Sequence, residues 1–569
     1  MCHSKIKVLV HSNYSRLVTG FGKNMRNILL ALYEDPDIEV IEAANGVRND
    51  ADLATPWQSY GTYPNDANIL HEIENDPMKK RAAQYGFYCI DSIIEKVKPD
   101  IYLGIEDIWA FDKFDEKPWW NSTKKILWTT LDSLPILDQG FKMHGLCDKM
   151  LVWASFAEKA MTESGYKDVE TVHGAIDYSH FKPLENRQQL RKNFNLDEDF
   201  VIGFVFKNQL RKSVPNLLEG FKLFKQENPT IKAKLLLHTD WGEKTMNNWD
   251  VVRYIEEKQI DKSDILASYV CHSCEKYIVS PYRGEEQTCP FCSSQKSLNT
   301  KTSIKGVSEQ QLNEIYNLMD VYCHPFTSGG QEIPIQEAKS AGLITLVTEY
   351  SCGTDSCYEH QGGIPLEWNE YREPSTQFIK ASTCPKSISA ELKRVFYMPK
   401  EDKQKLIENG INYVKKAFSV ENTVSRLKDI FKSIELKKID SKPSDESKKI
   451  PTLEDLLSDV PTEQRIAVLM PQSAGDVLMV NSLIENLHEL YPDKKIFFFT
   501  DPRFFDMIND NPYIYRLLPY QKNLDNLHVL EGRYDHKGFF EIAFLPHIGT
   551  QKIFNYHHNA KDKNQFQIR

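Results

Sequence analysis

The sequence contains no apolar run that approaches the roughly 20 residues required to span a bilayer. Its first ten residues, MCHSKIKVLV, contain no signal-peptide core followed by a cleavage site. Short-period repeats and strongly biased tracts are also absent. We therefore expect a cytoplasmic protein without a transmembrane segment.

An excess of basic residues is lacking as well. Lys and Arg number 70 against 80 Asp and Glu, which gives a formal net charge of −10. This balance disfavours a general binder of nucleic acid or of anionic membranes, although a local basic groove stays open. The 569 residues exceed what one hydrophobic core supports, and about 150 residues per domain predicts three or four units.

What the sequence does contain is a recurring pattern of short apolar runs followed by segments with helical spacing. Such runs fit buried parallel strands. The first group lies at 6–12, 100–106, 125–132 and 149–155, and the second at 200–207, 232–240, 320–326 and 343–350. Strands that alternate with helices predict an α/β fold with two Rossmann-like, doubly wound domains and a ligand cleft between them.

A polar, charged, proline-bearing segment at 437–464 has the composition of a linker. Another pattern of strand, turn, helix and strand follows it. We therefore expect an N-terminal Rossmann-like domain at 1–176, a second at 177–436, the linker, and a third, C-terminal Rossmann-like half-domain at 465–569.

Four cysteines form the strongest local signal in the chain. Cys271 and Cys274 make one CxxC pair and Cys289 and Cys292 another, with fourteen residues between the pairs. Four thiolates at this spacing are typical of a zinc ribbon, whose structural zinc has no open position for a substrate. We place the ribbon at 266–300 as an insertion in the second domain. A redox dithiol is an alternative, and contact of the ribbon with nucleic acid stays open although its glutamates disfavour it.

The stretch FTSGGQEIPIQEAKSAG combines two glycines with the start of a helix. Gly329 and Gly330 allow the backbone to approach a ligand, and the amides at a helix N-terminus attract phosphate. Pro334 suits the first turn of that helix, and we expect Glu337 within the same turn. Glu337 either accepts a hydrogen bond from a sugar diol or serves as a partner of the helix dipole.

Two further segments fit a phosphate site. In KNQLRKSVPNLLEGF, Lys207, Arg211 and Lys212 crowd the end of a strand, where they either neutralise a diphosphate or form a solvated surface. In TGFG, Gly20 and Gly22 follow the first strand and either admit a ligand from across the cleft or form a plain tight turn.

In this order the segments resemble the GT-B fold and glycosyltransferase family 4, whose members are retaining enzymes that use nucleotide-sugar donors. TVHGAIDYSHFKP is similar to the family's domain-entry motif, KNQLRKSVPNLLEGF to its basic diphosphate motif, and the segment 307–342 to its donor-site signature. The resemblance covers roughly residues 5–436. It implies an acceptor-side domain at 1–176 and a donor-binding domain at 177–436.

The resemblance also implies roles for residues. Lys212 and Arg211 would stabilise a departing diphosphate without a catalytic divalent metal, and Asp132 would orient the acceptor, unless it is a plain turn residue. The implied donor-binding residues are Gly20, Gly22, Lys207, Ser328, Gly329, Gly330, Gln331, Glu332 and Glu337. A nucleotide sugar would be the co-substrate, and a glycan or glycoconjugate the acceptor.

Two positions depart from the family pattern. Gly329 stands where the first of two family glutamates is usual, so that Glu332 or the amides of Gly330 and Gln331 would replace it. Leu131 stands where a histidine is usual. Two other functions therefore stay open: glycosylation of modified nucleic-acid bases, which the ribbon favours and the acidic balance disfavours, and sugar-nucleotide binding by a scaffold without catalysis.

The segment 465–501 resembles the N-terminal half of the heptosyltransferases, glycosyltransferase family 9, including a Gly-Asp pair at Gly475 and Asp476. The range 465–569 has room for about one Rossmann-like half. This size implies an interaction or acceptor-presenting module rather than a second active site.

Overall fold

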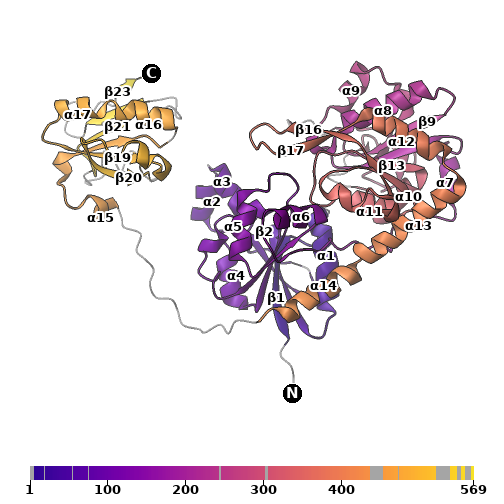
Figure 1. Ribbon diagram of the computed structural model, residues 1–569, viewed down its shortest axis with the longest axis horizontal. Coiled ribbons are helices and arrows are strands. Elements are labelled where there is room, and N and C mark those ends of the chain that lie inside the picture. Colours follow the sequence, from indigo (N-terminus) through magenta and orange to yellow (C-terminus); the bar gives the residue numbers. More distant parts are fainter. Residues whose placement is uncertain are drawn as a thin grey trace. The chain divides into compact units, whose positions relative to one another are not determined.

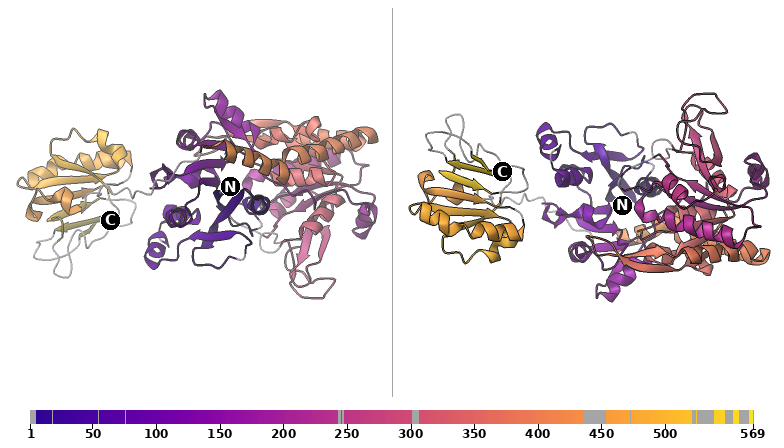
Figure 2. Two further views of the ribbon diagram at one scale, coloured as in Figure 1. Left: turned by 90° about the horizontal axis from the view of Figure 1, so that it is seen from below. Right: turned by 90° about the horizontal axis from the view of Figure 1, so that it is seen from above.

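The computed structural model describes residues 5–17, 19–53, 55–74, 76–242, 245, 247–300, 306–435, 453–471, 473–520, 524, 538–546, 553–557 and 566–568. The chain divides into two compact units, Met1–Asp440 and Ser441–Arg569. The first unit contains two lobes, and each lobe is a largely parallel sheet with helices on both faces (Figures 1 and 2).

The first lobe is a parallel sheet in the order β3-β2-β1-β4-β5-β6-β7. Its strands are β1 (Ile6–Asn13), β2 (Ile38–Arg48), β3 (Gln58–Tyr63), β4 (Ile101–Ile105), β5 (Lys124–Thr129), β6 (Lys149–Val152) and β7 (Val169–Thr171). Its helices are α1 (Gly20–Tyr33), α2 (Ala67–Glu74), α3 (Pro77–Gln84), α4 (Ile90–Val97), α5 (Asp138–Leu146) and α6 (Ser155–Glu163). The strand order reverses between β1 and β4, and ligands of such folds bind at this switch point.

The second lobe has the strand order β11-β10-β9-β8-β13-β14-β15. Its strands are β8 (Phe200–Val205), β9 (Ala233–His238), β10 (Ile265–Cys271), β11 (Tyr277–Pro281), β13 (Val321–His324), β14 (Ile344–Thr348) and β15 (Gly363–Leu366). Its helices are α7 (Arg187–Asn193), α8 (Val214–Glu227), α9 (Val251–Glu257), α10 (Glu309–Leu318), α11 (Ile333–Ser340), α12 (Pro385–Tyr397) and α13 (Lys400–Ala417). Here the strand order reverses between β8 and β13.

All eight apolar runs predicted as strands form strands of these two sheets, which confirms the predicted α/β fold class. Some predicted ranges continue past the strand end, as at 320–326, because Phe326 in the following loop is itself fully buried. The apolar pattern did not predict β2, whose Glu42 and Asn45 are polar yet buried. Glu42 is tolerated there because Trp57 Nε1 donates a hydrogen bond of 2.8 Å to its carboxylate.

Helix α14 (Val420–Ser433) packs on the first lobe, although the predicted range 177–436 places it in the second domain. Val424, Leu427 and Phe431 share a hydrophobic core with residues of the first sheet. The chain returns to the first lobe beside the point where it left, since the amide of Ile176 donates to the carbonyl of Phe418 at 2.8 Å. Figure 1 shows α13 in the second lobe and α14 along the first.

A two-stranded hairpin joins the lobes at another point. Strands β16 (Trp368–Arg372) and β17 (Ile379–Thr383) form an antiparallel pair that extends from the second lobe toward the first (Figure 1). The amide of Ile379 donates to the carbonyl of Leu134 at 2.7 Å. The hairpin therefore places β17 next to the loop that follows β5.

The second compact unit contains a smaller sheet in the order β20-β19-β18-β21-β22-β23. Its strands are β18 (Arg465–Leu469), β19 (Lys495–Thr500), β20 (Ile514–Pro519), β21 (Ile542–Leu545), β22 (Ile553–His557) and β23 (Phe566–Ile568), and its longer helices are α16 (Ala474–Asn481) and α17 (Ile484–Leu490). The first four strands are mutually parallel, as expected for a Rossmann-like half-domain. Gly475 and Asp476 lie at the start of α16.

The predicted linker is described only in its second half, because 437–452 lies outside the described residues. Helix α15 (Leu453–Leu457) falls within the predicted linker range. Leu453, Leu457 and Val460 are nevertheless buried in the core of the second unit.

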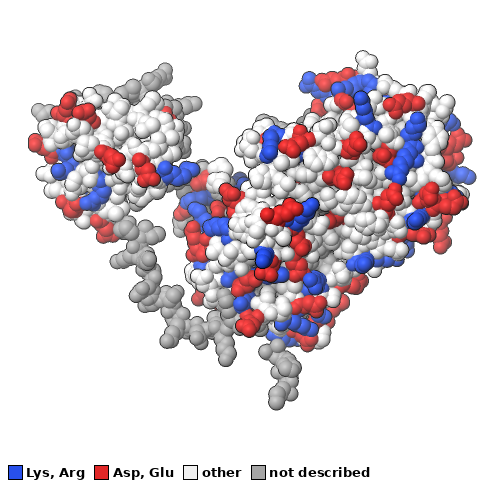
Figure 3. Space-filling view, in the orientation of Figure 1, with Lys and Arg blue, Asp and Glu red and all other residues white. Residues whose placement is uncertain are grey.

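The surface of the first unit mixes both signs of charge. On the face shown in Figure 3, Lys and Arg are interspersed with Asp and Glu over both lobes. Among the described residues, no helix combines the length and the apolarity that crossing a membrane requires.

Candidate active site

The predicted phosphate-binding segments meet at the carboxyl ends of β8 and β13, where the strand order of the second sheet reverses. Arg211 and Lys212 lie in the loop after β8, and the residues 328–332 lie in the loop after β13. The amide of Thr327 donates to the carbonyl of Arg211 at 2.8 Å, which joins the two loops. Neighbouring parallel strands end at the same edge of a sheet, so two segments far apart in the sequence form one site.

The glycine loop leads directly into α11, which begins at Ile333 with Pro334 in its first turn as predicted. The amide of Gly329 donates to Ser351 Oγ at 3.2 Å. Within the described part of the chain, the amides of Gly330 and Gln331 form no hydrogen bond. These two amides precede a helix N-terminus, the position at which proteins commonly bind phosphate.

Glu332 is the centre of a buried ionic cluster. Its carboxylate accepts from the guanidinium of Arg211 and from the ammonium of Lys212, and His324 Nε2 lies 3.2 Å from the same carboxylate. The side chains of Glu332 and Lys212 are almost fully buried, whereas that of Arg211 keeps 42% of its surface exposed. Arg211 is therefore the member of the cluster that an entering anion meets first.

The electrostatics of this cluster leave it with a net positive charge. Burial alone would raise the pKa of Glu332, but Arg211 and Lys212 hold it well below its usual range. Burial, with the nearby charge of Arg211, lowers the pKa of Lys212 to about 8. Burial also lowers the pKa of His324 to about 4, so this histidine is neutral. Two cations thus face one carboxylate at neutral pH.

Gly329 stands where the resemblance to glycosyltransferase family 4 predicts a glutamate, and the structure shows what lies there instead. A Cβ at Gly329 would lie 2.6 Å from Glu332 Oε1 and 3.3 Å from Arg211 Nη1. The carboxylate of Glu332 therefore fills the space that a side chain at 329 would enter. The partners of this carboxylate are the two cations, and contact of Glu332 with a donor stays a prediction.

The loop also contacts the first lobe. Gln331 Oε1 accepts a hydrogen bond of 2.7 Å from the amide of Gly174, at the crossing between the lobes. A Cβ at Gly330 would lie 2.2 Å from Thr130 Cγ2, so the absence of a side chain allows this close approach. The Gln331 side chain is thus engaged with the chain crossing, which leaves its backbone amide as the group available to a ligand.

The predicted catalytic Asp132 lies at this interface, in the loop after β5. Its Oδ2 accepts from Ser328 Oγ at 3.1 Å. Lys380 Nζ, on β17, donates to Ser328 Oγ and to Ser133 Oγ, each at 2.7 Å, and lies 3.9 Å from Asp132 Oδ1. The sequence analysis missed Lys380, because a lysine in a hairpin carries no pattern that distinguishes it from a surface lysine.

Glu337 is not in the first turn of α11, which corrects the prediction. It is the fifth residue of the helix, and its side chain is almost fully buried. Tyr316 Oη donates to its carboxylate at 2.9 Å, and Lys23 Nζ of the first lobe lies 3.5 Å away. The cavity between the lobes that Lys23 and Glu337 line has a volume of only about 20 Å³. Glu337 is therefore paired with Tyr316 and Lys23 rather than placed at the helix N-terminus, and its contact with a sugar diol stays a prediction.

The remaining predicted donor residues lie at different distances from this cluster. Gly20 starts α1, and a Cβ there would lie 3.5 Å from Ile333 Cδ1, so the TGFG turn faces the start of α11. A Cβ at Gly22 would lie 2.3 Å from the carbonyl oxygen of Leu17, so this glycine is required by the turn itself. Lys207 is exposed at the end of β8, and no hydrogen bond or ion pair joins it to the described residues.

Asp107, which sequence reasoning also missed, brings a second carboxylate to the interface. It follows β4, at the switch point of the first sheet, and accepts from the hydroxyl of Thr130. Burial raises the pKa of Asp107, while the Thr130 hydroxyl opposes the shift and the charge of Asp132 adds to it. The sequence signal that could have identified Asp107 is its position just after an apolar strand.

The four cysteines form a separate centre. Their sulfur atoms all lie within 4.8 Å of one another, and the pairs Cys271–Cys292 and Cys274–Cys289 are each separated by 3.7 Å. A tetrahedral zinc with Zn–S bonds of about 2.3 Å requires sulfur atoms about 3.8 Å apart. The donor set therefore fits zinc as predicted.

The two CxxC turns share one local geometry. The residues after the second cysteine of each, Glu275 and Ser293, have φ angles of 61° and 58°. The amide of Glu275 donates to the carbonyl of Cys271, and that of Ser293 to the carbonyl of Cys289, both at 2.9 Å. The repeated turn aims two thiolates at one point and leaves no ligand position for a substrate.

The ribbon is continuous with the second sheet. Strand β10, which ends at Cys271, pairs in parallel with β9 and antiparallel with β11 and with β12 (Leu298–Asn299). The predicted insertion at 266–300 therefore begins within β10 and adds β11 and β12 at the edge of the second sheet. A metal here stabilises the sheet edge as well as the ribbon.

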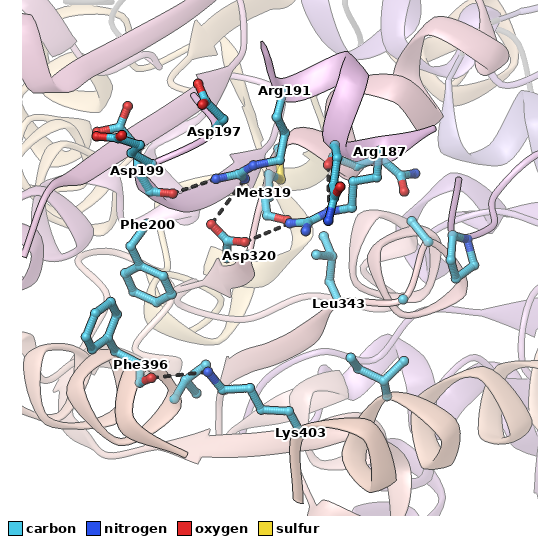
Figure 4. Close-up of a pocket in the computed structure, with 18 of the residues that line it drawn as sticks. Arg187, Arg191, Asp197, Asp199, Phe200, Met319, Asp320, Leu343, Phe396 and Lys403 are labelled. Carbon is cyan, nitrogen blue, oxygen red and sulfur yellow. Dashed lines mark hydrogen bonds and ion pairs between the residues drawn. The ribbon is translucent and has the colours of Figure 1, made fainter. Parts of the chain in front are cut away.

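A large cavity of about 780 Å³ lies elsewhere in the second lobe (Figure 4). It borders the amino ends of β8, β13 and β14, opposite the edge that carries Arg211. Its arginines are already paired, since Arg187 and Arg191 lie 2.7 and 3.1 Å from the carboxylate of Asp320. This cavity is therefore distinct from the candidate site, because it lies at the other ends of the strands and its arginines are already paired with a carboxylate.

No family model matches the chain, and its sequence matches no curated protein. Solved structures do match. Sucrose-phosphate synthase from Thermosynechococcus elongatus superposes with a TM-score of 0.51 and 10% identity, over 75% of this chain and 98% of that one. The N-terminal domain of Candida albicans trehalose-6-phosphate phosphatase gives 0.51 and 11%, over 76% and 98%. HepE from Anabaena in complex with UDP-glucose gives 0.50 and 10%, over 75% and 100%. These likenesses establish that the chain has the GT-B fold.

Proposed function

We propose that this protein is a retaining glycosyltransferase, similar to family 4, that transfers a sugar from a nucleotide-sugar donor to a hydroxyl group of a glycan or glycoconjugate. The observation that carries the proposal is the meeting of Arg211 and Lys212 with the free amides of Gly330 and Gln331 at one switch point. The GT-B fold supports it, and so does the UDP-glucose bound to HepE, a structural neighbour.

In the proposed reaction, these groups act on the leaving nucleoside diphosphate. The bond between the anomeric carbon and the phosphate oxygen breaks, and the diphosphate departs with the electron pair. The partly exposed Arg211 and the loop amides stabilise the developing negative charge. The buried Lys212 adds a second positive charge beside Arg211. These cations take the role that a divalent metal plays in other transferases.

The acceptor oxygen forms the new bond on the face from which the diphosphate leaves, so that the anomeric configuration is retained. Its proton passes to a phosphate oxygen of the leaving group, and no side chain serves as a nucleophile. Asp132 orients the acceptor hydroxyl, and Lys380 and Ser328 hold Asp132 against the donor loop. A zinc ion held by Cys271, Cys274, Cys289 and Cys292 would stay outside this chemistry, because four thiolates would fill its tetrahedral coordination.

A second candidate function is sugar-nucleotide binding without catalysis. It is favoured by Glu332, whose carboxylate already neutralises one of the two cations, and by the leucine at 131. We assign the second compact unit, with its half-Rossmann sheet, an interaction or acceptor-presenting role in either case.

The test is a panel of nucleotide sugars in which release of nucleoside diphosphate is followed with and without acceptor mixtures. Turnover of one donor supports the transferase, and nuclear magnetic resonance of the product's anomeric carbon reports retention. Binding of a donor without turnover in any acceptor mixture supports the second candidate. Inclusion of duplex DNA containing modified bases among the acceptors tests nucleic-acid glycosylation.

A further inference from the structure

Two neighbouring cavities open on the first lobe at the carboxyl edge of its sheet. The smaller, of about 180 Å³, is lined by Asp107, Thr130 and Asp132. The larger, of about 800 Å³, lies between α3, the short helix Ile108–Phe111 and α5. Trp109 lines both cavities, so they share one wall.

The larger cavity has an aromatic wall. Tyr85, Phe87, Tyr88 and Trp109 line it, and the ring centroids of Tyr85 and Trp109 lie 4.7 Å apart with an interplanar angle of 88°. The guanidinium carbon of Arg81 lies 3.6 Å from the centroid of the Trp109 ring. This packing holds Trp109 in place between the two cavities, and aromatic walls with a few polar groups are typical of sites for small organic ligands.

The charges around this wall nearly cancel, with four cations against three anions. The larger cavity is lined by the cations Lys79, Arg81, Lys113 and Lys142 and by the anions Asp112, Glu116 and Asp138. Lys79 and Lys142 form ion pairs with neighbouring acids, at 2.7 and 2.9 Å. A surface of this kind offers hydrogen-bond donors and acceptors without the cationic excess that a nucleic-acid backbone requires. It suits a neutral ligand with many hydroxyl groups.

The smaller cavity connects this wall to the candidate active site. Asp132 in it accepts from Ser328 of the donor loop, and Asp107 accepts from Thr130, which touches Gly330 of the same loop. Two carboxylates at the bottom can accept hydrogen bonds from two hydroxyls of a sugar. Its volume lies below the about 300–1,000 Å³ of common ligand sites, so it admits only one end of a larger ligand.

From this juxtaposition we propose that the two cavities together form the acceptor site and that they take a saccharide of at least two units. The terminal unit lies against Asp107 and Asp132, and the next unit stacks on the aromatic wall at Trp109. This inference rests on the proposed transferase function. It adds the class of acceptor, a neutral oligosaccharide end, and the side chains that select it.

The experiment uses the full chain on an array of neutral mono- to hexasaccharides, with single-stranded oligothymidine and phosphatidylglycerol vesicles as parallel probes. We expect retention on saccharides of two or more units, with at least tenfold weaker binding of monosaccharides. Trp109→Ala should lose at least tenfold in affinity, while Trp109→Phe, which keeps an aromatic face, and Tyr397→Ala, at an exposed remote site, should bind as the unchanged protein does.

Donor chemistry is measured separately in the unchanged protein, as the slow release of diphosphate from nucleotide sugars without acceptor. If no donor is bound or turned over, the transferase proposal fails whatever the array shows. The acceptor proposal is overturned if no oligosaccharide is retained, if monosaccharides bind equally well, if only DNA or vesicles bind, or if Trp109→Ala binds oligosaccharides normally.

Discussion

Asp132 of the first lobe and Ser328 of the second are joined by a hydrogen bond of 3.1 Å between Oδ2 and Oγ. Lys380 donates to the same Ser328 hydroxyl at 2.7 Å. One buried lysine and one carboxylate thus contribute to the contact between the first lobe and the loop after β13. We expect a change at any of these three residues to weaken this contact between the lobes.

Lys380→Met is therefore expected to lower kcat by up to about 10²-fold, as found for small misplacements of reacting groups. The effect should fall on kcat more than on the KM of the donor, because Lys380 contacts Asp132, Ser133 and Ser328 but not the cluster of Arg211, Lys212 and Glu332. Steady-state kinetics with varied donor measure the split. The control is Lys386→Met, which changes an exposed lysine on α12. Equal kinetics of the two variants would mean that Lys380 does not position the reacting groups.

The pH dependence should report Lys212. Its pKa is lowered to about 8 by burial and by Arg211, with Glu332 opposing. The ammonium is charged below that pH and loses its proton above it, so kcat/KM should fall as the pH rises through about 8. A bound diphosphate raises the pKa, so the fall in kcat should come at higher pH. Lys212→Arg should abolish the fall in kcat/KM at high pH. An unchanged pH profile in that variant would contradict the assignment of the fall to Lys212.

Glu332→Gln tests the buried cluster through stability. The substitution removes the carboxylate charge that balances Arg211 and Lys212. Removal of one partner of a buried ion pair lowers the free energy of unfolding by about 3–5 kcal/mol. Because the pKa of Glu332 is depressed, its contribution is present above an unfolded pKa of about 4.3 and is lost as the pH falls through the lower folded value. Chemical denaturation between pH 3 and 7 should thus show that the free energy of unfolding falls less with decreasing pH in the variant than in the unchanged protein.

The surface pair Arg394–Glu359, whose atoms lie 2.6 Å apart, provides the control for that experiment. Both side chains are largely exposed, so Glu359→Gln should change the free energy of unfolding by about 0–1 kcal/mol. The double variant Lys212→Met with Glu332→Gln should recover part of the loss. Additive costs in the double variant would mean that the two side chains are not coupled.

Gly330→Ala should disturb the contact between the lobes. The added Cβ would lie 2.2 Å from Thr130 Cγ2, and overpacking of this kind typically costs about 1–3 kcal/mol. Combination with Thr130→Gly removes the clashing atoms and should restore the melting temperature. Gly145→Ala, where the new Cβ meets no atom within 4 Å, is the matched control in thermal unfolding. A harmless Gly330→Ala would show that the loop does not pack against Thr130.

Cys271→Ser should remove about one zinc per chain and destabilise the second lobe, because β10 ends at this cysteine and belongs to both the sheet and the ribbon. We expect a fall in melting temperature of about 5 °C or more, measured together with metal content by mass spectrometry. Cys147→Ser, outside the cluster, should retain zinc. A folded, metal-free variant that binds donor normally but cannot turn over would contradict a structural role for the zinc.

The strands and the metal centre were predictable because both depend on local pattern. An apolar run such as 200–207 forms a buried strand wherever it is placed in a sheet, and a CxxC turn aims two thiolates by its own backbone hydrogen bonds. The resemblance to glycosyltransferase family 4 singled out the loop at 328–332 for the same reason, and its role in donor binding stays a prediction. It could not say which direction the side chain of Glu337 takes, because that depends on Tyr316 and Lys23, which come from other elements.

The sequence by itself determined the α/β lobes, the order of their loops and the four zinc ligands. The tertiary structure alone decided that Glu332 neutralises Arg211 and Lys212, that Lys380 reaches Asp132, and that α14 returns to the first lobe. The physical reason is that a strand or a turn is set by interactions within a few residues. A charge partner is set by which loops two separate sheets bring to a common edge, and no local pattern encodes that meeting.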